Sequence, residues 1–463
     1  MAQPHVPPRF QVLAKPSGAS CNLACTYCFF LDKELLYPGS NFRMSADLLE
    51  AYIQQLISAH HTSEVTVSWQ GGEPTLMGLD FFCKAVALQD KYRRPGMTFE
   101  NTLQTNGTLL DDAWCEFFKE HNFLIGISLD GPRHIHDIFR VDRGGAPTFD
   151  RVMRGIRLLQ KHRVEYNILA TVNRISADHP KEIYQFLRDE VGTQWIQFIP
   201  VIERMNPDGR NLIQAGDHVS PRSVRPIQFG RFLIQVFDEW VQHDVGKIFV
   251  QTFEAALRNW MRLSTSGMCV FEKTCGIGLA LEHNGDLYSC DHFVEPDYLL
   301  GNIKDKDMLE LVGSAEQMKF GQDKFNSLPK TCLRCPVLFA CNGECPKNRF
   351  SSTPAGEPGL NYLCAGYKAF FQHADEPMKV MALLMNDGRP ASHVMGILAE
   401  RKQELLRAYQ VCTPEAACPC QSGLQYKECH GWSLRKSDRK RGSKPIGGPR
   451  SAVVRASTVL RCR

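Results

Sequence analysis

The chain has 463 residues, of which 43% are hydrophobic and 22% are charged, and its formal net charge at pH 7 is +4. This composition is that of an ordinary globular protein, which excludes a wholly disordered chain and an integral membrane protein. Because one hydrophobic core rarely organises a chain of this length, we expect a large domain and at least one smaller module.

The segment before the first predicted strand contains prolines and a histidine where a secretory signal peptide needs an unbroken apolar run. No apolar run is long enough to cross a membrane. In a reducing cytosol, the 18 cysteines of the chain are poor candidates for disulfides. We therefore expect a cytoplasmic protein with no membrane partner, whose cysteines bind metal ions or clusters.

Six runs rich in apolar and β-branched residues predict strands, at residues 10–14, 65–69, 98–103, 123–129, 164–171 and 195–201. Amphipathic patterns predict helices in the gaps, at residues 45–59, 79–92, 111–120, 149–161 and 180–189. Strands that alternate with helices form a parallel sheet. The predicted fold class is therefore α/β, a partial (β/α)6 TIM-like barrel, since eight units need more chain than this.

In such a barrel the functional side chains follow the carboxyl ends of the strands. A cysteine-rich loop follows the first predicted strand, and Gln-Gly-Gly-Glu-Pro at 70–74 follows the second. Polar segments at 104–107 and 128–132 follow the third and the fourth. We expect these segments to form the functional site.

The loop after the first strand contains Cys21, Cys25 and Cys28 at the spacing C-x3-C-x2-C. Three thiolates leave one iron of a 4Fe-4S cluster open to a further ligand, because such a cluster normally takes four. A structural zinc, or a cluster with a fourth cysteine from elsewhere, would fit the same spacing. The loop sequence Cys-Asn-Leu-Ala-Cys-Thr-Tyr-Cys-Phe-Phe resembles the signature of radical S-adenosylmethionine (SAM) enzymes, which implies a SAM-binding cluster.

This resemblance also implies roles for the polar segments. Gly71, Gly72 and Glu73 match the family segment that receives the amino group of the methionine moiety of SAM. Three further residues match positions that lie against SAM or the bound peptide in this family: Gln70, Ser128 and Arg140. Taken alone, the glycines would indicate a turn, and the polar residues would indicate strand ends or solvated side chains.

Eight further cysteines form a second group: Cys269, Cys275, Cys290, Cys332, Cys335, Cys341, Cys345 and Cys364. Eight thiolates suffice for two more 4Fe-4S clusters without an open iron, and they would equally hold two zinc ions. Their spacing resembles the twin-cluster C-terminal domain known as SPASM. This resemblance implies that Cys269, Cys275, Cys290 and Cys345 bind one cluster, and that Cys332, Cys335, Cys341 and Cys364 bind the other.

Asp291 directly follows the assigned cluster ligand Cys290. Burial and a nearby anionic cluster both disfavour a carboxylate, so we expect a raised pKa that suits a proton acceptor. An Asp that caps a turn before His292 is the alternative.

Together these motifs resemble the anaerobic sulfatase-maturating enzymes over roughly residues 5–375. The resemblance implies that SAM and three 4Fe-4S clusters oxidise a Cys or Ser side chain of a sulfatase to Cα-formylglycine. It further implies that Asp291 is the catalytic base, that the sulfatase segment is unfolded or nascent, and that flavodoxin or ferredoxin donates electrons. Phe30 departs from the family, which often has Tyr at this position.

Two other classes of protein fit the same motifs. One is a different radical SAM peptide modifier of the SPASM type, which forms thioethers or epimerises residues. The other is a non-catalytic iron-sulfur redox sensor. Cleavage of SAM by the purified protein separates the enzymes from the sensor.

The C-terminal part carries Cys418, Cys420, Cys429 and His430, which resemble the SEC-C motif and imply a structural zinc. The last 31 residues contain ten Lys or Arg residues and one Asp, with no interleaved aromatic residue, so we expect a solvated tail and no nucleic-acid partner. The predicted domains are a barrel at 1–235, the twin-cluster domain at 236–375, a helical spacer at 376–411, the zinc motif at 412–432 and a basic, disordered tail at 433–463.

Overall fold

The computed structural model describes residues 10–28, 30–205, 216–420 and 422–429. The chain divides into two compact units, Met1–Ser392 and His393–Arg463. No helix in the described ranges is long and apolar enough to cross a membrane. The predicted basic tail, residues 433–463, lies outside the described residues.

The first unit is built around one sheet of ten strands. These are β1 (Gln11–Lys15), β2 (Glu64–Trp69), β3 (Thr98–Thr105), β4 (Phe123–Ser128), β5 (Tyr166–Val172), β6 (Trp195–Pro200), β7 (Phe249–Val250), β8 (Gly278–Glu282), β9 (Asp286–Tyr288) and β10 (Leu299–Asn302). The first six match the predicted strands to within two residues. The positions of these strands that face the covering helices are occupied by fully buried residues such as Val12, Val67 and Ile125, which explains the apolar pattern that predicted the strands.

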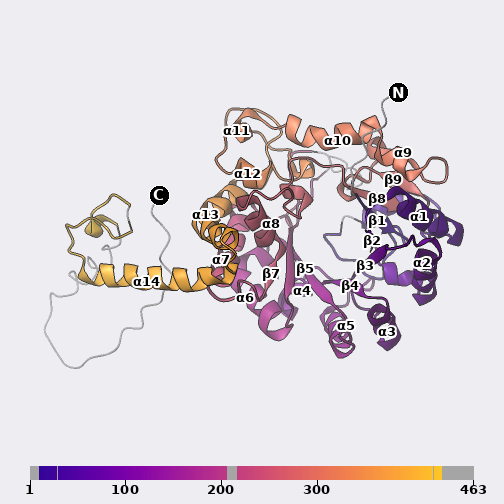
Figure 1. Cartoon of the computed structure of the whole chain (residues 1–463), viewed down its shortest axis with the longest axis horizontal. Coiled ribbons are helices and arrows are strands. Elements are labelled where there is room, and N and C mark those ends of the chain that lie inside the picture. The colour runs from indigo at the N-terminus through magenta and orange to yellow at the C-terminus, as the bar shows by residue number, and fades with distance from the viewer. Residues whose placement is uncertain (1–9, 29, 206–215, 421, 430–463) are drawn as a thin grey trace. The chain divides into compact units, whose positions relative to one another are not determined.

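Strands β1 to β7 are parallel to one another in chain order, and β8 pairs in parallel with the other edge of β1. β9 and β10 then extend this edge as antiparallel strands. The sheet curls round the interior of the unit without β7 meeting β8, so the barrel is open (Figure 1). The prediction of a partial barrel is therefore confirmed, and the cysteine-rich region joins the same sheet through β8.

The helices that cover the outer face of the barrel are α1 (Ala46–Ala59), α2 (Leu79–Tyr92), α3 (Asp112–Glu120), α5 (Phe149–Lys161) and α6 (Pro180–Gln185) (Figure 1). Two of them begin at capping side chains: Ser45 accepts a hydrogen bond from the Leu48 amide, and Asp111 accepts one from the Trp114 amide. The short helix α4 (Arg133–His136) follows β4. The predicted helix at 180–189 changes after α6 into a π-helical turn, Phe186–Glu190.

Two long helices join the barrel to the cysteine-rich region. Helix α7 (Pro226–His243) packs along α13 (Cys364–Asn386), and α8 (Gln251–Trp260) lies against both β6 and α13. A Cβ atom on Gly366 would stand 2.1 Å from the Pro226 carbonyl oxygen and 2.9 Å from the Gly230 amide nitrogen. Only glycine permits this approach. Helix α7 spans the predicted domain boundary at residue 235, and α13 spans the one at residue 375.

The cysteine-rich region also contains four short helices and turns between β10 and α13: α9 (Met308–Val312), α10 (Ala315–Asn326), α11 (Lys330–Leu333) and α12 (Leu338–Cys341). The second unit begins with α14 (Val394–Val411). An isolated bridge between Ala417 and Gln425 and a short turn, Tyr426–Glu428, follow it.

Candidate active site

The cysteine loop follows β1 at its carboxyl end. The amides of Ala24 and Thr26 donate hydrogen bonds of 2.9 Å to the carbonyl oxygens of Val141 and Phe139, which fixes the loop to the segment after α4. Cys25 and Tyr27 are buried in a small apolar cluster, and Cys21 and Cys28 pack against that cluster. The structure therefore holds all three thiols of the C-x3-C-x2-C motif on one anchored loop.

The surroundings of Cys21 suit a thiolate that binds iron. The Leu23 amide donates a hydrogen bond of 3.3 Å to its sulfur, and Asn106 Nδ2 approaches the same sulfur at 3.8 Å. Burial raises the pKa of the Cys21 thiol to about 12, so the proton must leave when a metal binds. Donors to sulfur then stabilise the bound thiolate.

Segment 70–74 lies directly against the cysteine loop. The Gly72 amide donates to the Gly18 carbonyl oxygen at 2.8 Å, and a Cβ atom on Gly72 would stand 2.1 Å from the Ser20 carbonyl oxygen. Gly71 has a φ of +129°, a conformation that side chains rarely adopt. Both glycines are therefore required for the backbone to approach the loop this closely.

Glu73 is fully buried behind this contact, where desolvation raises its pKa although four donors act in the opposite direction. Its Oε1 accepts hydrogen bonds from the amide and hydroxyl of Thr75, at 3.0 and 2.6 Å, and from the hydroxyl of Thr105, at 2.7 Å. Its Oε2 accepts one from the Asn106 amide at 2.8 Å. The carboxylate thus ties segment 70–74 to the end of β3, and its contact with SAM stays a prediction.

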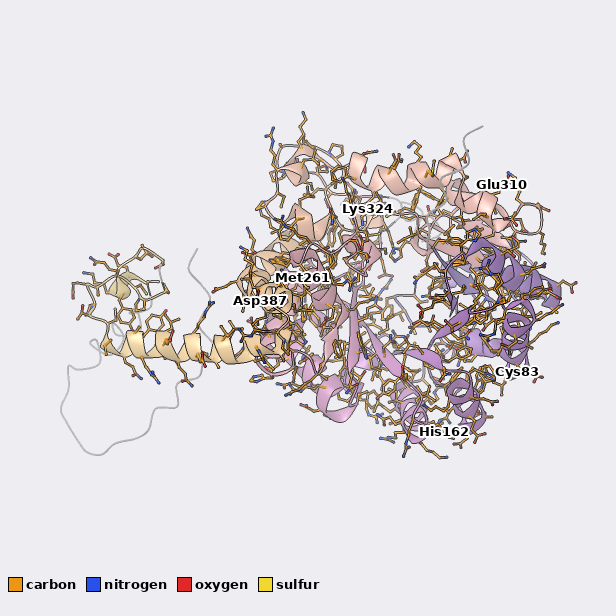
Figure 2. The ribbon with its side chains drawn as sticks, viewed as in Figure 1. Cys83, His162, Met261, Glu310, Lys324 and Asp387 are labelled. Carbon is orange, nitrogen blue, oxygen red and sulfur yellow. The ribbon has the colours of Figure 1, made fainter. Side chains whose placement is uncertain are left out.

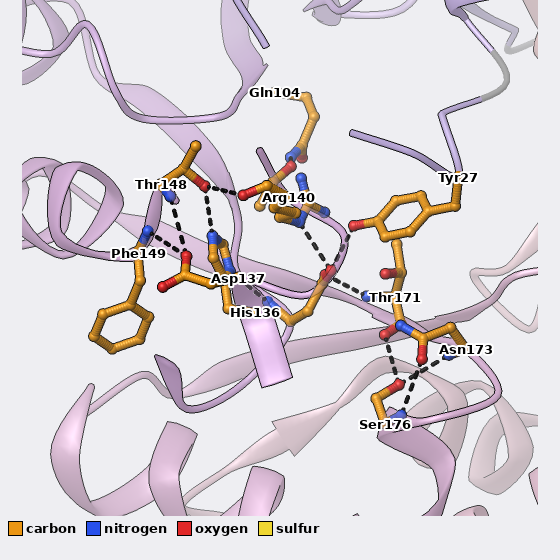
Figure 3. Close-up of polar contacts among 12 residues, drawn as sticks. Tyr27, Gln104, His136, Asp137, Arg140, Thr148, Phe149, Thr171, Asn173 and Ser176 are labelled. Atoms are coloured by element: carbon orange, nitrogen blue, oxygen red, sulfur yellow. Dashed lines mark hydrogen bonds and ion pairs between the residues drawn. The ribbon is translucent and has the colours of Figure 1, made fainter. Parts of the chain in front are cut away.

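Arg140 lies in a buried polar network that also contains Asp130 and Tyr27 (Figure 3). Arg140 Nε forms an ion pair of 3.0 Å with Asp130 Oδ2, which also accepts a hydrogen bond from the Tyr27 hydroxyl. The Thr171 amide donates to Asp130 Oδ1 at 2.9 Å. Burial alone would raise the pKa of Asp130, but the Arg140 guanidinium outweighs it and lowers the pKa below its usual value.

This network joins the cysteine loop to β4 and β5. The guanidinium of Arg140 lies 5.5 Å from the centre of the ring of Tyr27, a residue that stands between Cys25 and Cys28 in the sequence. His136 accepts a hydrogen bond of 3.3 Å from the Asp130 amide, and burial lowers the pKa of His136 to about 3, so the ring is neutral. Sequence reasoning missed the roles of Tyr27, Asp130 and His136; the buried acid after β4 was the available signal.

The remaining polar positions are nearby. The amide of Gln70 donates to the Ala14 carbonyl oxygen at 2.9 Å, which places Gln70 beside the end of β1. The hydroxyl of Ser128 accepts a hydrogen bond of 3.0 Å from Gln104 Nε2. The predicted segments after strands one to four therefore converge at one edge of the barrel, where SAM contacts by Gln70 and Ser128 stay a prediction.

The eight cysteines of the second group fall into two sets, within each of which the thiols interact electrostatically with one another. Cys269, Cys275, Cys290 and Cys345 form one set, because each thiol of this set interacts electrostatically with at least one other. Burial is the largest cause that raises the pKa of Cys290, to about 12. Cys332, Cys335, Cys341 and Cys364 form the other set, in which burial raises the pKa of Cys332 to about 11 and that of Cys341 to about 12. The SPASM resemblance implies the same grouping, and the binding of one cluster by each set stays a prediction.

Neither set has the geometry of a zinc site. A tetrahedral zinc with bonds of about 2.3 Å to sulfur holds its sulfur atoms about 3.8 Å apart. Within the described ranges, three thiols lie within 4.8 Å of one another only at Cys418, Cys420 and Cys429. The wider spacing of the other cysteines suits a larger cluster.

Basic side chains surround the first set. Lys324, on α10, is buried and donates hydrogen bonds of 2.6 and 3.0 Å to the carbonyl oxygens of Cys269 and Val270 (Figure 2). His292 Nδ1 lies 3.4 Å from the Cys345 sulfur. The Lys324 ammonium compensates part of the negative charge that four thiolates would bring to this region. Burial lowers the pKa of His292 to about 4, so its ring is neutral and contributes a polar contact only.

Asp291 meets the barrel at the last residue of β1. Its Oδ1 lies 2.6 Å from the Nζ of Lys15, whose side chain is 1% exposed. Glu282 Oε1 lies 3.5 Å from the same ammonium. Burial would raise the pKa of Asp291, but the charge of Lys15 prevails and lowers it. The expectation of a raised pKa was therefore wrong, because it omitted this cation.

Phe30 occupies the position where the family often has Tyr. The Nζ of Lys15 lies 4.6 Å from the centre of the Phe30 ring, so the face of this aromatic ring covers the ammonium group. Sequence reasoning missed Lys15, because nothing in the sequence places it beside a residue 276 positions away. A lysine at the end of a buried strand was the one available signal.

Three cysteines outside the assigned sets separate into different environments. Cys115 is buried in α3, whereas Cys83 is exposed on α2 (Figure 2). Cys412 is half-buried after α14. In the second unit the Cys420 sulfur lies 3.4 Å from that of Cys418 and 3.5 Å from that of Cys429. His430, the fourth predicted ligand, lies outside the described residues.

Comparisons with known proteins agree with this geometry. Residues 16–187 match the Radical SAM superfamily, residues 273–336 match an iron-sulfur cluster-binding domain, SPASM, and residues 416–431 match the SEC-C motif. The first match contains the cysteine loop and Arg140. The second contains four of the eight cysteines of the second group: Cys275, Cys290, Cys332 and Cys335.

Two similar proteins have names that state a function. A serine-type anaerobic sulfatase-maturating enzyme of Bacteroides thetaiotaomicron is 48% identical over 389 residues, which are 82% of this chain and 93% of the relative. A cysteine-type enzyme of Clostridium perfringens is 32% identical over 373 residues, 79% of this chain and 96% of the relative.

A solved structure of native anSMEcpe with bound AdoMet and the Cp18Cys peptide has the same fold. Its TM-score is 0.72 at 32% identity, and the match covers 81% of this chain and 99% of the solved one.

Proposed function

Because the chain belongs to the anaerobic sulfatase-maturating enzymes, we propose that it oxidises a Cys or Ser side chain of a sulfatase polypeptide to Cα-formylglycine. It is a radical SAM enzyme. The serine-type relatives are 48% and 37% identical to it and the cysteine-type relative 32%, so a serine substrate is the first to test.

One observation carries the proposal: the cysteine loop, the segment 70–74 and Asp291 all meet at the carboxyl end of β1. The cysteine loop begins there, and a Cβ atom on Gly71 would stand 3.3 Å from the Cβ of Lys15. The side chain of Lys15 then contacts Asp291, which comes from the cysteine-rich region. An ordinary structural cluster would not need a buried acid at this junction.

Each group has a place in the reaction. Cys21, Cys25 and Cys28 would hold the cluster with the open iron, and the segment Gly71–Glu73 would orient SAM beside it. When bound, this cluster and SAM would supply the 5'-deoxyadenosyl radical, which removes a hydrogen atom from Cβ of the substrate residue.

Asp291 takes the thiol or hydroxyl proton of the substrate as the side chain becomes an aldehyde, or a thioaldehyde that hydrolyses to one. Asp291 is paired with the Lys15 ammonium as a carboxylate, which is the form that can accept a proton. Lys15 is a positioning residue: its ammonium holds the carboxylate at the end of β1.

The finer assignments belong to the same proposal. The two sets of four cysteines would hold two auxiliary 4Fe-4S clusters, and Cys418, Cys420, Cys429 and His430 would hold a structural zinc. A flavodoxin or ferredoxin would supply electrons in a reducing cytoplasm, where free thiols persist.

Anaerobic incubation of the reconstituted enzyme with SAM, dithionite and a sulfatase-derived peptide tests the proposal. Matched peptides carry Ser, Cys or Ala at the target position, and mass spectrometry with an aldehyde-specific reagent follows the product. We expect aldehyde from the Ser or Cys peptide and none from the Ala peptide. A thioether or an epimerised residue in place of the aldehyde would reassign the enzyme to another class of peptide modifier.

A further inference from the structure

A basic surface lies where the segment after β5 meets the first turns of α7. It borders a cavity of about 570 Å³ and is formed by Arg174, Arg225 and Arg231, hereafter the arginine surface. Two isoleucines in the same lining, Ile175 and Ile227, are 38% and 49% exposed. Three arginines against the one carboxylate of Asp178 leave an excess of positive charge around these apolar side chains, a combination typical of protein interaction sites.

The charge of this surface is not neutralised within the fold. No carboxylate in the described part of the chain forms an ion pair with any of the three arginines. Asp178 also lines the cavity, but its Oδ1 accepts a hydrogen bond of 2.8 Å from Gln228 Nε2. His179 pairs with Glu182 at 2.9 Å. Arg174 Nε donates a hydrogen bond of 3.2 Å to the Ser223 carbonyl oxygen, but a neutral carbonyl leaves the charge of the guanidinium uncompensated.

The arginine surface adjoins the second set of cysteines. Pro226, at the start of α7, touches Gly366 of α13, and Cys364 is the first residue of α13. The exposed Lys368, one helical turn after Cys364, adds a further cation beside the start of α13.

Tyr362 connects the two features. Its phenol is half-buried, and Arg174 and Arg225 both act on it electrostatically. Its ring stacks on that of Phe350 with centroids 5.4 Å apart, and the guanidinium of Arg204 lies 4.8 Å from the centre of the Phe350 ring. A continuous basic and aromatic strip thus runs from the arginine surface to the start of α13.

We propose that the arginine surface is the docking site of an acidic one-electron carrier protein, which exchanges electrons with the enzyme on the Cys364 side. This inference rests on the proposed function, in which Cys364 is a cluster ligand. Oxidation of the substrate radical to the aldehyde releases one proton and one electron. Asp291 takes the proton, and the carrier takes the electron in a one-electron reduction. No bond forms between the two proteins.

Two features favour a carrier over the sulfatase polypeptide. Redox partners form small, short-lived complexes that depend on charge to guide encounter, and three unpaired arginines round a small apolar centre supply this. The surface also lies beside a cluster ligand, whereas Asp291 meets the barrel at the end of β1, four strands away from β5 in the sheet.

Calorimetry with the cluster-loaded enzyme and a bacterial flavodoxin at low ionic strength tests the proposal. The charge-reversed variant Arg174→Glu/Arg225→Glu/Arg231→Glu should bind flavodoxin at least about tenfold more weakly and lose the salt dependence of Kd. The milder variant Arg225→Gln/Arg231→Gln guards against misfolding and should show a smaller loss in the same direction. Formylglycine formation with dithionite should stay at the wild-type rate in both variants.

A variant with the same change in net charge is the matched control. Lys84→Glu/Lys119→Glu/Arg157→Glu alters exposed residues of α2, α3 and α5 and should bind flavodoxin as the wild type does. Equal weakening by both triple variants, or no flavodoxin binding by the wild type, overturns the proposal. Unchanged flavodoxin binding with a raised KM for the peptide assigns the surface to the sulfatase instead. Failure of the wild type to form aldehyde with dithionite is a separate result, which refutes the proposed function.

Discussion

The two units of the chain arrange their cysteines differently. In the second unit, the sulfur atoms of Cys418, Cys420 and Cys429 lie within 4.8 Å of one another, as a single tetrahedral ion requires. In the first unit, the eleven assigned cysteines form no such group among the described residues, although they converge in three places. The difference shows how the spacing of thiols in a fold distinguishes a single ion from a multinuclear cluster.

The largest effect should come from the cysteine loop. Replacing Cys21, Cys25 and Cys28 by Ala should abolish SAM cleavage, because no other assigned cluster leaves an iron open. Most of the iron should remain, since the other eight cysteines are intact. Iron analysis and chromatographic detection of 5'-deoxyadenosine measure both. Cys83→Ala, an exposed change on α2, is the control, and surviving SAM cleavage in the triple variant would refute the assignment.

Asp291→Asn should produce the next largest effect. We expect formylglycine formation to fall by about 10²–10⁴-fold, the scale lost with a required proton acceptor, while SAM is still cleaved in the presence of peptide. Quantifying formylglycine and 5'-deoxyadenosine in the same reaction gives the ratio of the two. The exposed Asp297→Asn lies in the same segment and should leave that ratio unchanged. A wild-type ratio for Asp291→Asn would remove this residue from the mechanism.

Lys15→Met should have an intermediate effect. Removing one partner of a buried ion pair leaves Asp291 without its cation, at a cost of about 3–5 kcal/mol in stability. Since the carboxylate also loses its fixed position, we expect formylglycine formation to slow by about tenfold or more at equal cluster content. Thermal unfolding and turnover are measured together. Lys15→Arg keeps the charge and should recover part of both quantities; equal loss in the two variants would mean that shape, not charge, matters here.

The second unit should matter least. Deleting residues 415–463 should change peptide turnover by less than about twofold, because a module built around its own metal contributes few contacts to its neighbours. Zinc should disappear from the protein, which mass spectrometry of the metal content detects. Full-length enzyme with equal iron loading is the reference. Normal SAM cleavage without peptide oxidation would show that the second unit belongs to the active site.

Much of the fold followed from local patterns. The apolar runs of β1 to β6 and the capping residues Ser45 and Asp111 act within a few residues of one another, so periodicity placed these elements well. The short β7 and the joining of β8 to β1 were not predicted. They depend on pairing between segments far apart in the chain, which periodicity does not report.

The sequence by itself determined the motifs in which the functional residues lie close together along the chain. The spacing of Cys21, Cys25 and Cys28, the glycines at 71 and 72, and the cysteine order from Cys269 to Cys364 all indicate ligands within short segments. Spacing could predict them because a loop or a hairpin holds such residues together in any fold that contains it.

Only the tertiary structure decided which distant side chains act on these segments. Lys15 reaches Asp291 because β8 lies beside β1, and this contact reverses the expected direction of the pKa shift. The arginine surface meets α13 because two glycines, Gly230 and Gly366, bring α7 and α13 into contact. Electrostatic interactions depend on distance through space, and the sequence does not contain that distance until the chain has folded.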